Sequence, residues 1–188
     1  MIGLLIGLSV FLSVHSVRIF APSWRGARIA DWGENGWKRG FSVLSIAGFL
    51  LLLWGYGQAR LAPVLLWTPP PAMRPVAALL MLLAFVLLVA AYVPGNGIKA
   101  RLGHPMVLAI KLWALAHLLV NGRLHAVVLF GSFMVWAALS FRAARRREPP
   151  SRAPSALWRT LLAVLIGGVA WAVFALVLHR RWIGVAPF

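Results

Sequence analysis

PMVLAIKLWALAHLLVNGRLHAVVLFGSFMVWAALSF, residues 105–141, is the stretch that decides the fold of this chain. It holds two apolar runs, Pro105 to Val120 and Leu124 to Phe141, with almost no connection between them. A helix that crosses a bilayer needs roughly 20 mainly apolar residues, and both runs are close to that length. Because so short a connection keeps neighbouring helices side by side, the stretch predicts an antiparallel helical hairpin in a membrane.

Similar apolar runs fill most of the 188 residues, of which 62% are hydrophobic and only 12% charged. In soluble domains roughly a quarter of all residues are charged. The runs are apolar on all sides, whereas barrel strands alternate apolar and polar residues. We therefore predict an all-α, polytopic integral membrane six-helix bundle, a single domain over residues 1–188. The predicted spans are Ile2 to Phe20, Phe41 to Ala59, Arg74 to Val93, Pro105 to Val120, Leu124 to Phe141 and Leu157 to Leu178.

The first run has no preceding basic residue and no convincing signal-peptide cleavage site, so we expect it to remain as the first span. Segment 21–40, rich in Gly, Trp and Arg, is expected to be a loop with an interfacial segment at headgroup level. Segment 142–156 is a charged, proline-containing connection to the last span. That span contains no ionisable residue between Arg159 and His179 and is expected to be peripheral.

The net charge of +16 arises from the connections between the runs. The connections after spans one, three and five, with their helix ends, hold thirteen basic residues, and the opposite side holds five. The thirteen are Arg18, Arg25, Arg28, Lys38, Arg39, Lys99, Arg101, Arg142, Arg145, Arg146, Arg147, Arg152 and Arg159. By the positive-inside rule their side is cytoplasmic, which predicts periplasmic termini in a bacterial inner membrane. This distribution argues for a lipid bilayer and against a nucleic-acid partner.

The chain has no cysteine, which excludes disulfides, thiolate ligands and covalent c-type haem. Its three acidic residues, Asp31, Glu34 and Glu148, all fall in predicted loops. Carboxylate proton relays, sodium-coupled transport and aspartyl proteolysis need acidic side chains at membrane depth, so these functions are disfavoured.

His15 and Arg18 are the first ionisable pair at the edge of a predicted span. They are three residues apart and share one helical face, with Arg18 nearer the cytoplasmic boundary. One interpretation is that Arg18 extends to the interface while His15 hydrogen-bonds a neighbouring helix. The alternative is a haem site, with the imidazole for iron and the guanidinium for a propionate.

The fourth span carries His117 on a stripe with Trp113 and Ala114, where a small residue beside an aromatic wall suits a flat ligand. A buried histidine satisfied by a hydroxyl is the structural alternative. Lys111 could extend to the cytoplasmic boundary or pair with a propionate. His104, directly before Pro105, is an interfacial cap or a reserve iron ligand. His125 and His179, near extracytoplasmic helix ends, are expected to be solvated.

Two inward-facing imidazoles can clamp a haem between helices, which makes His15 and His117 the predicted iron ligands. Measured from their shared cytoplasmic boundary, His15 is about 8 Å deep and His117 about 20 Å. The two-histidine site therefore needs a tilted macrocycle or a longer fourth helix. His104 matches the depth of His15 better and stays in reserve.

Five separated motifs in this order resemble the NnrU family of membrane proteins. They are HSVR at 15–18, APSWR at 21–25, FSVLSIAGFLLLLWGYG at 41–57, AAYVPGN at 90–96 and HPMVLAIKLWALAHLLVNG at 104–122. The similarity covers about residues 1–145, and the last span is less characteristic. The resemblance implies a role in denitrifying bacteria, where NnrU proteins are required for expression of nitrite and nitric oxide reductase activity.

The family is similar to the zeta-carotene isomerases, which use haem b to isomerise a cis double bond. The resemblance implies haem histidines at His15 and His117, and the residue pattern adds Arg18, Trp113 and Lys111 as predicted cofactor contacts. The isomerase cysteine corresponds to Ala114, whose methyl group cannot coordinate iron. The leading hypothesis is a haem b protein supporting nitrogen-oxide respiration by electron transfer, haem handling or redox sensing, with a respiratory or nitrogen-oxide reductase partner. The alternatives are a haem-dependent isomerase of a hydrophobic polyene and a cofactor-free assembly factor that holds a partner by its basic loops.

Overall fold

A computed structural model describes residues 1–150 and 154–187 and is all-α in its named elements. The helices are α1 (Ile2–Phe20), α2 (Pro22–Leu61), α3 (Met73–Tyr92), α4 (Gly97–Leu102), α5 (Pro105–Val120), α6 (Leu124–Arg147), α7 (Leu157–Val173), the π-helical turn η1 (Phe174–Leu178) and α8 (His179–Ile183). Because α7, η1 and α8 form one continuous helix, the described part of the chain has seven helices. All six predicted spans are helical.

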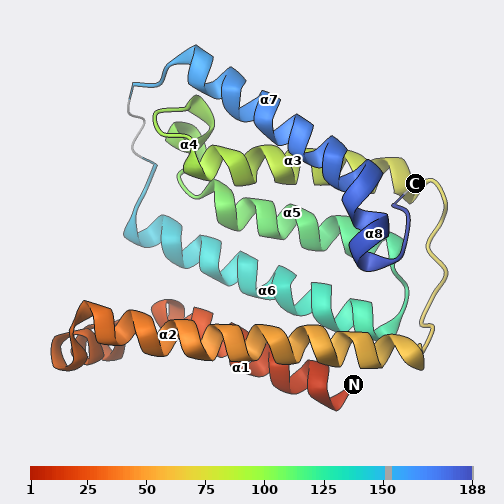
Figure 1. Cartoon of the computed structure of the whole chain (residues 1–188). Coiled ribbons are helices and arrows are strands. Elements are labelled where there is room, and N and C mark those ends of the chain that lie inside the picture. Colours follow the sequence, from red (N-terminus) through yellow and green to blue (C-terminus); the bar gives the residue numbers. More distant parts are fainter. Residues whose placement is uncertain (151–153, 188) are drawn as a thin grey trace.

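Helix α6 lies between two groups of helices (Figure 1). On one side, α1 packs along α2 and against α6. On the other side, α5 packs on α6 and on α3, and α7 lies outermost, beside α3. The two termini are at one end of the bundle (Figure 1), and the basic connections are at the other.

The chain is an integral membrane protein with several spans. Five helices are long and apolar enough to cross a bilayer: α1, α2, α3, α6 and the continuous helix Leu157–Ile183. The remaining predicted span, α5, is apolar but has 16 residues. At 1.5 Å per residue it is about 24 Å long, shorter than the roughly 30 Å hydrocarbon core.

The expectation of a loop over 21–40 is wrong, because α2 already begins at Pro22. Proline suits the first helical turn, where its missing N–H costs no hydrogen bond. The helix is interrupted at Gly33, where φ is 70° and ψ is 163°. Ion pairs one turn apart brace the two sides of this break, Arg28 to Asp31 before it and Lys38 to Glu34 after it.

Glycines allow α1 and α2 to pack with their backbones in close contact. A Cβ on Gly55 of α2 would collide with the backbone of Leu4, and one on Gly7 of α1 would collide with the backbone of Leu52. Gly3 and Gly7 form a GxxxG motif, which is typical of close helix pairs in membranes. Since both glycine faces meet, the first two helices form one tightly packed unit.

The α5–α6 hairpin is confirmed, and its turn is tied to the connection after α2. Leu65 and Arg123 form an antiparallel bridge, and the Leu66 N–H donates to the Gly122 carbonyl at 2.8 Å. His125, near the start of α6, is only 4% exposed, and its ring meets the Tyr56 ring of α2 edge-on at 5.1 Å. The expectation that His125 is solvated is therefore wrong.

Candidate ligand pocket

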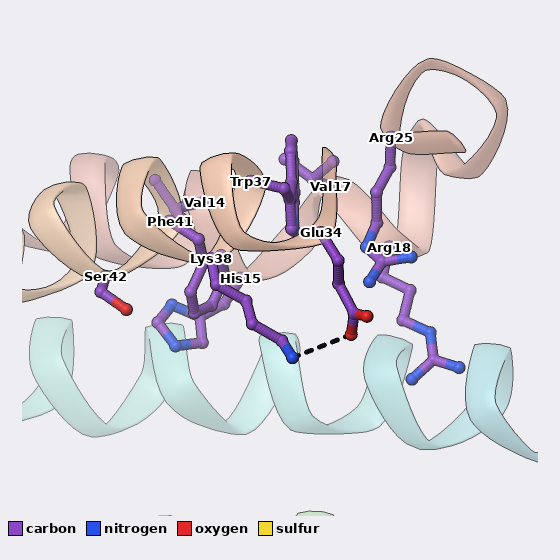
Figure 2. A pocket seen from close by; sticks show the side chains of 10 residues that line it. All are labelled: Val14, His15, Val17, Arg18, Arg25, Glu34, Trp37, Lys38, Phe41 and Ser42. Atoms are coloured by element: carbon purple, nitrogen blue, oxygen red, sulfur yellow. Dashed lines mark ion pairs between the residues drawn. The ribbon is translucent and has the colours of Figure 1, made fainter. Parts of the chain in front are cut away.

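A pocket of about 320 Å³ opens between α1 and α2 at the basic end of the bundle (Figure 2). Ten residues line it: Val14, His15, Val17, Arg18, Arg25, Glu34, Trp37, Lys38, Phe41 and Ser42. Pockets for small ligands have volumes of about 300–1,000 Å³. The lining residues form an apolar and aromatic wall, with charged side chains towards one end of the pocket.

His15 is half-buried among aromatic rings. It stacks on Phe11 with a centroid distance of 4.1 Å and meets Phe41 edge-on at 5.1 Å. Trp136 of α6 faces it edge-on at 6.2 Å. Within the described residues, the buried indole N–H of Trp136 has no hydrogen-bond partner, which is unusual for a buried donor.

The two predicted haem ligands share one feature of their hydrogen bonding. The Nδ1 atom of His15 lies 2.7 Å from the Phe11 carbonyl oxygen, and that of His117 lies 2.8 Å from the Trp113 carbonyl oxygen. A carbonyl oxygen only accepts, so Nδ1 carries the proton in each neutral ring. Each Nε2 atom therefore has a free lone pair, and a backbone bond of this kind often orients a metal-binding imidazole.

Two of the three cations that line the pocket are paired with carboxylates. Arg18 donates to Glu148, at the end of α6, at 2.8 Å. Lys38 pairs with Glu34 at 2.8 Å, and the hydrogen bond and charge of its ammonium lower the pKa of this exposed carboxyl (Figure 2). Arg25 instead lies over the Trp37 ring at 5.6 Å and has no carboxylate partner among the described residues.

His117 and Trp113 lie in a second aromatic cluster, outside the pocket. His117 stacks on Phe130 of α6 at 4.4 Å, and Trp113 lies 5.4 Å from the His117 ring. Ala114 beside them is fully buried in the hydrophobic core. This packing leaves His117 surrounded by side chains of α5 and α6.

The structure does not bring His15 and His117 to one cavity. Helix α6 packs against both α1 and α5, whose backbones do not approach each other closely in the described residues. Phe133 of α6 fills the intervening space, with its ring 5.9 Å from Phe11 and 5.4 Å from Trp113. His15 lines the pocket between α1 and α2, whereas His117 is not among the residues that line it.

The other predicted contacts lie elsewhere. Lys111 is exposed on α5 and does not line the pocket. His104 precedes α5, and its Nε2 lies 2.9 Å from the Glu148 backbone oxygen, so it belongs to the contacts that join α5 and α6 at the basic end. His179 hydrogen-bonds the Val185 carbonyl oxygen through Nδ1. Arg152, one of the thirteen counted cations, lies outside the described residues.

Several pocket residues were missed by the sequence reasoning, chiefly Arg25, Trp37, Phe41 and Ser42. They come from the segment that was expected to be a loop, or directly follow it. One signal could have found them: Pro22 as the start of a helix that continues into the second span. The described residues contain no group of three or more His, Cys, Asp or Glu that could hold a metal ion.

Fold and pocket together define a polytopic helical membrane protein with an aromatic, cation-edged pocket near one face. A family model described as NnrU protein matches residues 3–187. The chain belongs to the NnrU family over nearly its whole length, and the match includes the last helix, which the sequence motifs had left out. No curated protein and no solved structure matches the chain.

Proposed function

We propose that this NnrU-family protein binds haem b in the pocket between α1 and α2, where His15 Nε2 would hold the iron. The observation that carries the proposal is the His15 ring, whose Nδ1 is held by the Phe11 carbonyl while its other side adjoins a pocket. When bound, haem would supply a redox-active iron. Phe11 and Phe41 would flank the ligating ring and limit the access of water.

The residues of the pocket fit one end of a haem better than a two-histidine clamp. They offer one imidazole, an apolar wall and cations at one end, which matches an iron, a porphyrin face and propionates. His117 would share the iron only if the Phe130 and Phe133 rings left their places between the helices. We therefore propose His15 as the ligand on which binding depends, and the clamp of His15 with His117 is the alternative that the variants below test.

We place the protein in the bacterial inner membrane with six crossings and both termini periplasmic. The two chain ends lie at one end of the bundle, opposite the basic connections (Figure 1), which supports an even number of crossings. The positive-inside rule then places the pocket near the cytoplasmic face. A haem there would serve nitrogen-oxide respiration by electron transfer, haem handling or redox sensing, together with a respiratory or nitrogen-oxide reductase partner.

An absorption spectrum of the purified protein, expressed with ample haem, tests the proposal. The protein should show a Soret band that His15→Ala abolishes or shifts, whereas His117→Ala, remote from the pocket, should leave it in place. Loss of the band in both variants would instead support the two-histidine clamp. A colourless protein would overturn haem binding and leave the assembly-factor hypothesis.

Isomerisation of a polyene gains no support from the geometry. Ala114, at the position of the isomerase cysteine, is fully buried in the core and does not line the pocket. A thiol that exchanges with an iron ligand needs access to the iron, and this position has none. Incubation of reduced protein with a cis-polyene, followed by chromatography, should therefore give no all-trans product.

A further inference from the structure

The charged end of the pocket contains more positive charge than its own carboxylates neutralise. Arg18, Arg25 and Lys38 line it, and a single carboxylate, that of Glu34, lines it with them. Glu34 is bound to Lys38, and Arg18 is bound to Glu148 from outside the pocket. The hydrogen bond and charge of Lys38 lower the pKa of Glu34, and the charge of Arg25 helps to lower it, but the Arg25 guanidinium forms no ion pair with a carboxylate among the described residues.

Arg25 is also held in place for binding. It is half-buried, and its guanidinium lies over the Trp37 ring, 5.6 Å from the centroid, so that its planar fork is partly ordered before a ligand arrives. Figure 2 shows the Arg25 and Arg18 side chains at the same end of the pocket, from α2 and α1, with the Arg18 guanidinium extending towards α6. An ordered guanidinium is well suited to a carboxylate or phosphate, which it can hold through two parallel hydrogen bonds.

Glu148, at the C-terminal end of α6, reaches one of these cations, Arg18. Its carboxylate accepts from Arg18, and its backbone oxygen lies 2.9 Å from His104 Nε2. Arg147 donates in turn to the Arg18 carbonyl oxygen at 2.9 Å. Both partners of the Arg18–Glu148 ion pair are more than half exposed, and such pairs are weak, so an anion in the pocket can take over Arg18.

We propose that Arg25 and Arg18 form an oxyanion-binding subsite at the charged end of the pocket and that Glu148 competes with the bound anion for Arg18. The ligand is a carboxylate or a phosphate on an otherwise apolar molecule, because the rest of the wall is apolar. Two sources fit this chemistry, the propionates of haem and the phosphate of an anionic lipid. The subsite uses the pocket of the proposed function but does not depend on iron ligation.

Binding of haem b and of its dimethyl ester to the full chain in phosphatidylcholine nanodiscs tests the propionate source. Arg25→Gln should weaken haem binding about tenfold, the usual loss for a charge-assisted hydrogen bond. It should have little effect on the ester, which lacks the carboxylates. Glu148→Gln should tighten haem binding about threefold, since it removes a weak competitor. Arg39→Gln, the same charge change on the same helix but outside the pocket, is the control.

Anionic lipid is the second arm, and it separates this proposal from haem binding. If the wild-type protein binds no haem, the proposed function fails, and the thermal midpoint in phosphatidylglycerol nanodiscs decides the subsite. A midpoint that rises relative to phosphatidylcholine in wild type and Arg39→Gln, but not in Arg25→Gln, supports it. If Arg25→Gln and Arg39→Gln have the same haem affinity and the same thermal midpoint in phosphatidylglycerol nanodiscs, the oxyanion subsite is overturned.

Discussion

The hydrogen bond from His15 Nδ1 to the Phe11 carbonyl fixes which nitrogen of the ring is open to a ligand. Residue identity alone could nominate His15 and His117 as ligands, and it also gave the shared face of His15 and Arg18. It could not show that both rings use their Nδ1 atoms on their own helices. Nor could it show that His125 is covered by Tyr56, because that contact joins helices α2 and α6, far apart in sequence.

Gly122 gives a residue-scale prediction. A Cβ at this position would collide with the Trp67 carbonyl, where the α5–α6 turn meets the connection after α2. Gly122→Ala should lower the free energy of unfolding by about 1–3 kcal/mol, the usual cost of overpacking. Denaturation in detergent, followed by circular dichroism, measures the change.

Gly131→Ala is the matched control. It lies within α6 with open space around the added methyl group, and alanine favours helix over glycine by about 1 kcal/mol. This variant should be unchanged or slightly more stable. Equal destabilisation of the two variants would contradict the close contact at Gly122.

At the scale of the element, the apolar runs could be converted to helices directly, because length and composition decide whether a segment can cross a bilayer. The first half of α2 could not be predicted in this way. Four glycines between Ala21 and Phe41 lower its helix propensity, and its charges are typical of a connection. Ion pairs on both sides of Gly33 and packing of Trp37 beside α1 compensate, and neither is visible in composition.

Asn96 gives an element-scale prediction. It is 1% exposed; its amide donates to the carbonyls of Ala90, in the last turn of α3, and of Val93, which follows α3. Its side-chain oxygen accepts from the Lys99 N–H and caps α4. Asn96→Ala removes all three bonds and should cost about 1–3 kcal/mol of unfolding free energy.

Asn96→Asp separates the two roles of this side chain, because it keeps the capping acceptor and loses both donors. If the cap stabilises α4, Asn96→Asp should be less stable than wild type, because it loses both donated hydrogen bonds, but more stable than Asn96→Ala. A variant Asn96→Ala as stable as wild type in the same denaturation experiment would show that the joint between α3 and α4 does not depend on this residue.

At the scale of the whole molecule, the position of α6 between α1 and α5 separates the two predicted haem histidines. This arrangement depends on contacts between distant segments, so helical stripes on single spans could not predict it. The depth mismatch between His15 and His117 was the one sign in the sequence that a simple clamp would be strained. The antiparallel packing of α5 and α6, in contrast, followed from their short connection.

Membrane orientation is a prediction for the whole molecule, and the absence of cysteine makes it easy to measure. A single cysteine is introduced at Thr68, between α2 and α3, or at Asn35, in the basic half of α2; both residues are exposed. In intact spheroplasts a membrane-impermeant maleimide should label Thr68→Cys and spare Asn35→Cys until the cells are lysed. The reverse pattern would place the pocket on the periplasmic side.

The most direct test of the central claim, that His15 holds haem in the pocket between α1 and α2, is rescue by imidazole. His15→Ala protein is titrated with haem in the absence and presence of free imidazole, and the Soret band is recorded. We predict that the variant binds haem poorly, that imidazole restores a spectrum close to that of wild type, and that His117→Ala needs no rescue. A His15→Ala spectrum identical to wild type without imidazole would contradict the claim.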